Sequence, residues 1–288
     1  MSISRQNLSV VIVNFKSDHV IYNCINSIDK NIDILVVDNS NNVDFKKNIE
    51  KKYDNVKCIL SPENIGMGAG NNLGIKNVNK DFVLILNPDV ILQGDTIDEI
   101  INASHIIDSF GIMSPISNKI EYPNYKLDEK EQNNFDAVKP FKVKSVDGYA
   151  MLLNLKRLKK INNFNFFDEN FFLYLENDDL CLRVKNRKEN IYIIKNSLIN
   201  HTGGISKKQN LEYLRNWHWM WSKFYFNKKH YGFLTAFSKI FFNLFSSIFK
   251  SIFYLITLNH HKKKIYQMRV SGLVNSIIGK KSFFRIND

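Results

Sequence analysis

Acidic and amide side chains follow the apolar runs of this sequence. The residues in these positions are Asn14, the pair Asp38-Asn39, Asn64 with Gly66, and Asn87-Pro-Asp89. Each could be an ordinary turn residue, but four polar groups at equivalent positions favour a binding site. Mg²⁺ and Mn²⁺ prefer oxygen ligands, so Asp89 is a candidate metal ligand.

A second group of candidates lies further along the chain. Glu176, Asp178 and Asp179 place three carboxylates within four residues. In a cleft, a raised pKa or a bound cation would relieve their repulsion. The alternative is a helix N-terminus, where acids interact favourably with the dipole; it explains Asp178 and Asp179 better than Glu176. His201 precedes two glycines, which indicate a close backbone approach, although a lone histidine is more often structural.

Glycines recur between residues 64 and 74, at positions that include Gly66 and Gly70. The segment differs from a dinucleotide-binding fingerprint, because it follows the third expected strand and Asn71 stands at the third-glycine position. We interpret it as a tight loop that opens a helix, whose N–H groups could face a phosphate. Close packing of a helix on a sheet is the alternative.

Strand-like and helix-like patterns alternate in the first 110 residues. Strands are expected at 9–14, 32–38, 56–60 and 82–86, and helices at about 17–29, 43–53, 67–78 and 95–108. This order predicts an α/β fold with a Rossmann-like, mostly parallel sheet flanked by helices, which binds ligands beyond the carboxyl ends of its strands.

The second half of this region is less regular. We expect a surface loop over 117–140, a strand over 143–153 that contains Asp147-Gly148, and short strands at 191–194 and 198–201. A helical run should extend from the acidic group to about residue 188.

The composition is that of a globular protein, with 44% hydrophobic and 24% charged residues among 288. The three cysteines are widely spaced and suggest neither a disulfide framework nor a metal site, which fits a reducing, cytoplasmic location. The apolar run at residues 8–13 is too short for a signal peptide or a membrane span.

All the excess charge lies at the C-terminal end. Residues 1–212 are electrically balanced, whereas residues 213–288 contain 13 basic residues and one acidic residue. We expect an amphipathic helix over 232–258, with a polar stripe at Lys239, Asn243, Ser246 and Lys250 facing water. With the basic cluster at 260–264, it should bind an anionic membrane surface. Packing on the body and a true span are alternatives; nucleic acid is disfavoured, because the charge lies in a Phe-rich stretch.

Six motifs together resemble family 2 glycosyltransferases, in particular a rhamnosyltransferase-like branch of bacterial surface-polysaccharide synthesis. They are Val-Ile-Val-Asn-Phe (11–15), Val-Val-Asp-Asn-Ser (36–40), Glu-Asn-Ile-Gly…Gly-Asn-Asn-Leu-Gly (63–74), Leu-Asn-Pro-Asp (86–89), Glu-Asn-Asp-Asp-Leu-Cys-Leu-Arg (176–183) and His-Thr-Gly-Gly (201–204). The resemblance covers about residues 8–220.

The resemblance implies a GT-A catalytic domain over 1–212 and a basic helical tail over 213–288. It implies inverting, Mg²⁺- or Mn²⁺-dependent transfer of a sugar from a nucleoside diphosphate sugar, with L-rhamnose from dTDP-rhamnose as the first choice. A UDP-sugar donor and a non-catalytic relative are the alternatives. The implied acceptor is a polyprenyl-diphosphate-linked saccharide, at the inner face of the bacterial plasma membrane.

Site roles follow from the same resemblance. The donor side would comprise Asn14, Asp38, Asn39, Asn64, Gly66, Gly70, Asn71, Asn87, Asp147 and Gly148, with Asp89 and His201 at the metal. The family motif reads Glu-Asp-x-Asp, and Asn177 occupies its second place here. Glu176, Asp178 and Asp179 therefore all remain candidates for the general base, with Glu176 first. Arg183 is expected to pair with these acids, while Arg215 and Trp217 could face the acceptor.

Overall fold

A computed structural model describes residues 2–118, 121–127, 139–162, 164–203 and 209–285 of the chain. The chain divides into two compact units. The first comprises residues 1–168 and 177–203, and the second comprises residues 169–176 and 204–288. The domain boundary expected at residue 213 falls inside helix α7 (Gln209–Tyr231).

The first unit is built on a nine-stranded sheet in the order β3-β2-β1-β4-β10-β6-β11-β5, with β8 also pairing with β11. The strands are β1 (Leu8–Asn14), β2 (Asp33–Asp38), β3 (Val56–Leu60), β4 (Phe82–Leu86), β5 (Val90–Leu92), β6 (Ile112–Ser117), β8 (Phe141–Lys142), β10 (Ala150–Asn154) and β11 (Ile191–His201). Strands β1–β4 are mutually parallel, and β10 is antiparallel to β4 and β6. The mostly parallel α/β sheet is confirmed.

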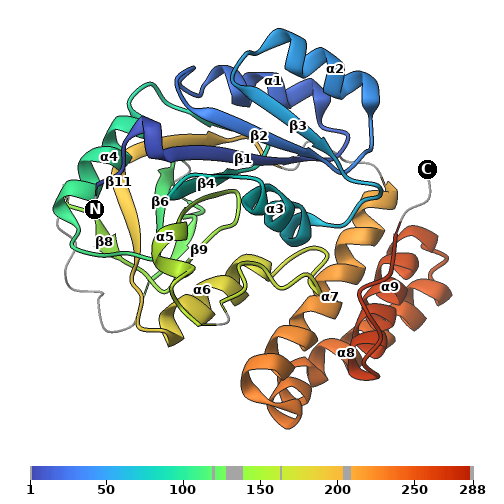
Figure 1. Ribbon diagram of the computed structural model, residues 1–288. Coiled ribbons are helices and arrows are strands. Elements are labelled where there is room, and N and C mark those ends of the chain that lie inside the picture. The colour runs from blue at the N-terminus through green and yellow to red at the C-terminus, as the bar shows by residue number, and fades with distance from the viewer. Residues whose placement is uncertain (1, 119–120, 128–138, 163, 204–208, 286–288) are drawn as a thin grey trace. The chain divides into compact units, whose positions relative to one another are not determined.

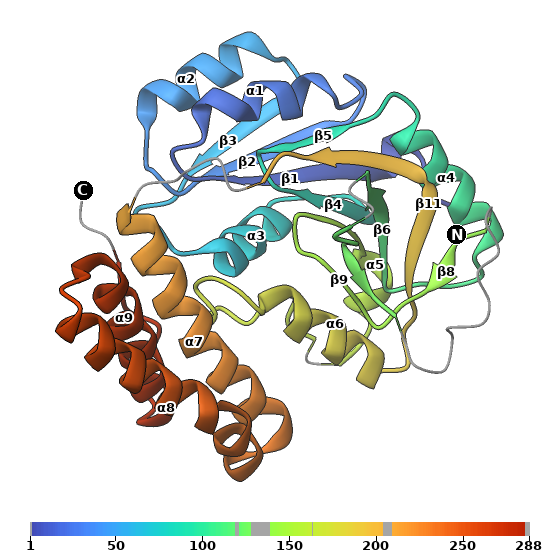
Figure 2. The ribbon, with the colours of Figure 1, turned by 180° about the vertical axis from the view of Figure 1, so that it is seen from behind.

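Helices cover both faces of this sheet (Figures 1 and 2). One core contains Val10 and Ile12 with α1 (Asp18–Asn26), α2 (Val43–Lys52) and α4 (Thr96–Ile106). The other contains Val11 with α3 (Met67–Lys76), α5 (Leu155–Leu158) and α6 (Glu176–Asn186). Successive side chains of a strand point to opposite faces, so continuous apolar runs such as β1 fit a sheet that is buried on both faces.

Two expected strands differ in the structure. The run 143–153 is divided into β9 (Ser145–Val146), which pairs with β7 (Tyr125–Lys126), and β10 in the main sheet. Asp147 and Gly148 therefore lie in the link. The runs 191–194 and 198–201 form one strand, β11, with a register shift between Ile194 and Leu198. Residues 119–120 and 128–138 of the expected loop lie outside the described residues.

The second unit contains α7, α8 (Phe233–Ile256) and α9 (His260–Ile277), each of which packs on the other two. Its core includes Met220, Phe224, Ile240 and Leu273. A Cβ on Gly272 would lie 2.3 Å from the Trp217 carbonyl oxygen, so glycine is required where α9 crosses α7. The expected C-terminal helix is present as α8.

The polar stripe of α8 is not the wet face that the sequence predicts. Asn243 accepts a hydrogen bond from Lys223 Nζ of α7 at 2.8 Å, and the lysines at 239 and 250 lie over Tyr231 and Tyr266. The stripe thus borders the packed side of the helix, because α7 and α9 supply polar and aromatic partners. The Phe-rich side is left open.

Candidate active site

The carboxyl ends of β1 and β2 lie side by side and form a buried polar network. Asn14 and Asp38 are register partners and fully buried. Asn14 Nδ2 donates to Asp38 Oδ1 and to Asp18 Oδ1, both at 3.0 Å. Asp38 Oδ2 accepts from the backbone N–H of Asn42 at 2.8 Å. The two residues expected at the nucleoside pocket are therefore brought together and held rigidly.

The loop before α3 joins this network through Asn39. Its Nδ2 donates to the Gly66 carbonyl at 3.1 Å and to Asn64 Oδ1 at 3.4 Å. Asn64 Oδ1 also accepts from the Gly66 N–H at 3.1 Å. Gly66 has φ 90°, a left-handed value that favours glycine, and as the N-cap of α3 it has no side chain to bond the first N–H groups. An anion can use such groups.

Small residues let α3 lie directly on β1. A Cβ on Gly70 would lie 2.9 Å from Val13 Cγ1, and one on Gly74 would lie 2.4 Å from Val11 Cγ1. Both interpretations of the glycine-rich segment thus have support: it opens a helix, and its later glycines serve close packing.

Three buried amide oxygens near these strand ends lack a hydrogen-bond partner among the described residues. They are Oδ1 of Asn14, Asn39 and Asn71, whose residues are 0%, 3% and 2% exposed. A buried unsatisfied acceptor costs about 1–3 kcal/mol. Hydroxyl or N–H groups of a bound ligand would satisfy these oxygens.

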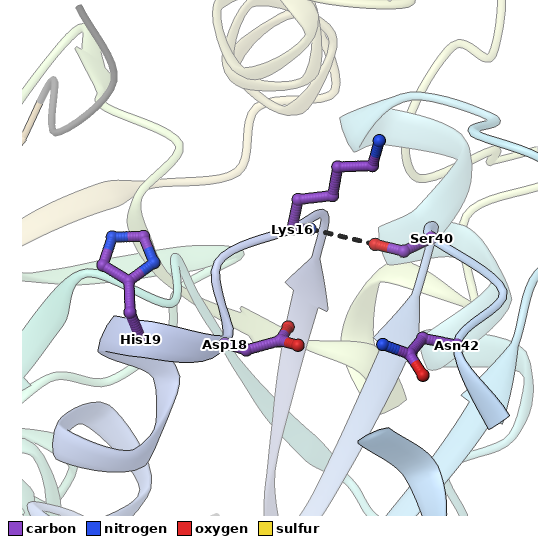
Figure 3. Close-up of a pocket in the computed structure, with 5 residues that line it drawn as sticks. All are labelled: Lys16, Asp18, His19, Ser40 and Asn42. Carbon is purple, nitrogen blue, oxygen red and sulfur yellow. Dashed lines mark hydrogen bonds between the residues drawn. The ribbon is translucent and has the colours of Figure 1, made fainter. Parts of the chain in front are cut away.

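A cavity of about 500 Å³ opens beside this network, within the size range of small-molecule sites. It is lined by Lys16, Asp18, His19, Ser40 and Asn42 (Figure 3). Ser40 Oγ accepts from the Lys16 N–H at 2.9 Å, which ties the β1 and β2 loops together. The sequence interpretation stopped at Asn14 and Asp38-Asn39, and missed these residues although they directly follow.

Asp89 and His201 meet although 111 positions separate them. Asp89 lies in the turn after β4, and His201 ends β11, where it pairs with Val90. His201 Nε2 lies 3.3 Å from Asp89 Oδ2. Burial alone would raise the pKa of Asp89, but its hydrogen bond and charge interaction with His201 outweigh burial and hold that pKa below its usual value. Asn87 contributes backbone bonds here, since its N–H donates to the Tyr149 carbonyl.

This pair fits a divalent cation. A carboxylate and an imidazole are both common ligands, and Mg²⁺ is usually held by one or two carboxylates together with substrate phosphates. No cluster of three or more His, Cys, Asp or Glu residues that could hold a metal lies within the described part of the chain. The remaining ligands would therefore come from a donor diphosphate and water. The Tyr149 ring stacks on the His201 ring at 3.9 Å and orients it; the sequence interpretation missed this residue.

Asp147 and Gly148 lie where α6 approaches the sheet. Burial, with the negative charge of Asp178, raises the pKa of Asp147. A Cβ on Gly148 would lie 3.1 Å from that of Asn177, whose Nδ2 donates to the Val146 carbonyl at 3.0 Å. Gly148 thus serves close packing at this point.

The acids of α6 have different surroundings. Asp179 is fully buried and pairs with Arg183 at 2.8 Å, as expected for this arginine, which also donates to the carbonyls of Asn165 and Phe166. Asp178 pairs with Lys126 at 2.7 Å. Glu176, the first residue of α6, is 8% exposed.

The expectation that Trp217 faces the acceptor is wrong. Its side chain is 1% exposed, and its indole N–H donates to Ser271 Oγ at 3.0 Å inside the helical unit. Tryptophan rarely leaves its large apolar surface in water when a helix–helix contact can bury it.

The sheet order, the helices on both faces and the polar strand ends define a GT-A fold. Among solved structures, similar folds occur in a mannosyltransferase from Pyrobaculum calidifontis in complex with GDP-Man and Mn²⁺ (TM-score 0.58, 10% identity, 96% of this chain and 89% of that one). GalNAc-T7 with UDP, GalNAc and Mn²⁺ is also similar (TM-score 0.58, 12% identity, 78% and 51% coverage).

Residues 9–161 match the sequence model described as Glycosyl transferase family 2, and the chain belongs to this family. It is 31% identical over 203 residues to the "Low-salt glycan biosynthesis hexosyltransferase Agl10" of Haloferax volcanii. The match covers 65% of this chain and 64% of that relative. An uncharacterized glycosyltransferase of Rickettsia prowazekii, RP339, is 32% identical over 113 residues, which are 38% of this chain and 32% of that protein.

Proposed function

We propose that this protein is an inverting glycosyltransferase that moves a sugar from a nucleoside diphosphate sugar to a saccharide acceptor. The meeting of Asp89 and His201 at the strand ends carries this proposal, because it joins two distant motifs into one ligand pair. The buried amide oxygens of Asn14, Asn39 and Asn71 support it, since a nucleoside offers hydroxyl and N–H donors.

In the proposed reaction the chain's own residues bind the donor and remove a proton. Asn14 and Asp38 hold the nucleoside side, and the N–H groups that open α3 face phosphate. Asp89 and His201 would hold Mg²⁺ or Mn²⁺, which neutralises negative charge on the leaving diphosphate. A carboxylate accepts the proton of the acceptor hydroxyl as that oxygen attacks the anomeric carbon, which is worth typically ~10²–10⁴-fold in rate.

Glu176 is our first candidate for this base. Asp179 is buried against Arg183 and links α6 to the segment around residue 165, which favours a structural role for it. Asp178 is held by Lys126 at 2.7 Å. Asp147 and Gly148 lie beside the start of α6 and are placed next to the sugar in this proposal.

For the donor we propose a hexose, with L-rhamnose from dTDP-rhamnose as the first choice. The rhamnosyltransferase-like motifs support this choice, and the relative named a hexosyltransferase supports the sugar class. UDP-linked galactose, glucose or N-acetylglucosamine are the alternatives. For the acceptor we propose a polyprenyl-diphosphate-linked saccharide in surface-polysaccharide synthesis, reached from the cytoplasmic face of the plasma membrane.

Replacing Asp89 tests the proposal. In Asp89→Asn we expect nucleoside diphosphate release from the donor to fall by at least ~10²-fold, because one metal ligand is lost. The matched control is Asp95→Asn, an exposed carboxylate six residues away, which should keep wild-type activity and melting temperature. Retained activity in a folded Asp89→Asn variant would remove the metal site, and no turnover by wild type with any donor would favour a non-catalytic relative.

A further inference from the structure

Helix α8 leaves one whole side without a partner among the described residues. Its packed side carries Ala236, Ile240 and Ser247, all buried against α7 and α9. The opposite side, which we call the Phe face, consists of Leu234, Phe241, Phe242, Phe245, Ile248, Phe249, Ile252 and Ile256. Phe242, Phe249 and Ile256 are 81%, 70% and 74% exposed. Contiguous apolar surface of this kind marks an interaction site.

Positive charge lies at both ends of α8. Lys228 and Lys229 stand at the end of α7, joined to α8 by the single residue Gly232. Lys262, Lys263 and Lys264 stand in the first turns of α9, just beyond the other end. No acidic residue occurs between Glu212 and Asp288. An apolar face between cationic ends complements a bilayer that exposes anionic headgroups.

From this arrangement we propose that the helical unit docks on anionic lipid through the Phe face, with α8 parallel to the membrane plane. This rests on the proposed function for its purpose, since it would hold the enzyme beside a lipid-linked acceptor. It also specifies which side of α8 enters the lipid: the Phe side, while the polar stripe stays against α7 and α9.

Two other occupants fit the structure less well. By length and composition α8 could cross a membrane, with a mean hydropathy of 1.4 over 18 residues. A spanning α8, however, would take Lys239 and Lys250 into hydrocarbon and break its contact with α7, including the bond from Lys223 to Asn243. A second copy of the chain would place like basic clusters together across a symmetric interface.

Vesicle flotation of the full chain tests this docking. We expect binding to phosphatidylcholine vesicles that contain 30% phosphatidylglycerol, little binding to pure phosphatidylcholine, and release by alkaline carbonate. Phe242→Ser/Phe249→Ser should weaken binding by more than about tenfold, because two large apolar side chains leave the lipid. The matched control Ile106→Ser, which changes a side chain 63% exposed on α4, should bind like wild type.

The charge component is tested in the same assay. Lys262→Gln/Lys264→Gln should weaken binding to the anionic vesicles by about tenfold, at ~1 kcal/mol per lysine. Lys47→Gln/Lys51→Gln, on exposed positions of α2, is the control. Equal binding of both double-lysine variants, or of wild type to both vesicle types, would overturn the anionic preference.

Three further outcomes would overturn the proposal. Unchanged binding of the folded Phe242→Ser/Phe249→Ser variant would exclude the Phe face. Resistance to carbonate would indicate a span, and a lipid-free dimer that this variant dissociates would indicate self-association. The assay contains neither donor nor acceptor, so its failure leaves the glycosyltransferase proposal standing. Failure of the Asp89 test likewise leaves the lipid surface standing.

Discussion

Side chains of one chemical type have separate roles in this protein, because their surroundings differ. Asn14 and Asn39 are held at strand ends by their N–H groups, while their buried oxygens remain for a ligand. Asn72, one residue after Asn71, instead exchanges two hydrogen bonds of 2.9 Å with the backbone of Phe167 and fixes the fold. Residue type alone does not separate these roles.

The acids of α6 allow the same separation to be tested. We expect Glu176→Gln to lower kcat by ~10²-fold or more while the melting temperature stays near that of wild type. Asp179→Ala should lower the free energy of unfolding by ~3 kcal/mol, because it leaves Arg183 without its buried partner. The measurements are steady-state kinetics and thermal unfolding of both variants. A stable Asp179→Ala enzyme without turnover would reverse the two assignments.

Sequence could predict much of the site at this scale. The residues after β1, β2 and β4 were identifiable because each follows an apolar run. The stacking of Tyr149 on His201 was not, because it depends on β10 and β11 lying in one sheet. The burial of Trp217 was likewise hidden, because it depends on how α9 crosses α7.

At the scale of elements, close contact between α3 and β1 sets where the helix opens. Gly74→Ala should destabilise the protein by ~1–3 kcal/mol through overpacking, since its Cβ would meet Val11 Cγ1 at 2.4 Å. Gly94→Ala, where a Cβ meets nothing within 4 Å, is the control and should be nearly neutral. Chemical denaturation followed by circular dichroism measures both.

A double variant checks the cause. Val11→Ala removes the methyl groups that the new Cβ would strike, so Val11→Ala/Gly74→Ala should be less destabilised than the sum of the two single changes. Strictly additive losses would show that the loss in Gly74→Ala has another origin.

Strand and helix patterns predicted most elements correctly, but not how they divide or face. Period and run length located β1–β4 and α1–α4 within a few residues. The 143–153 run was divided because β9 pairs with β7, a contact between distant segments. The facing of the polar stripe on α8 was set by Lys223, which lies 20 residues away.

At the scale of the whole molecule, charge and titration distinguish the helical unit. His218 is buried in α7; Nδ1 lies 2.8 Å from Ser282 Oγ, and Nε2 lies 2.8 Å from the Phe284 carbonyl. Burial lowers the pKa of His218 to about 4. The neutral ring satisfies both contacts, with the carbonyl accepting from Nε2–H and the hydroxyl donating to Nδ1. The C-terminal segment is thereby fastened to α7.

This burial predicts acid sensitivity of the helical unit. The folded pKa lies below the unfolded value of about 6.5, so the stabilisation is complete above that pH and is lost as pH falls towards 4. The total loss should be ~3 kcal/mol, at about 1.4 kcal/mol for each pKa unit. All three tryptophans lie in α7, so tryptophan fluorescence during urea unfolding follows this unit.

The comparison of histidine variants isolates the effect. His218→Asn should be less stable at pH 7 and should lose less stability between pH 6.5 and 4 than wild type. His105→Asn, an exposed position on α4, should keep the wild-type pH dependence. An unchanged slope in His218→Asn would assign the acid sensitivity to other groups.

The central claim is that the strand-end site binds a nucleoside diphosphate together with a divalent cation. Isothermal titration calorimetry with dTDP, UDP and GDP, each with Mn²⁺ and with EDTA, tests it most directly. We predict that at least one of the three binds, with affinity ~10–100-fold weaker in EDTA and in Asp89→Asn with Mn²⁺. dTDP preference would support the rhamnosyl assignment, and UDP preference would redirect it. Absence of binding by all three to the folded protein in Mn²⁺ would contradict the claim.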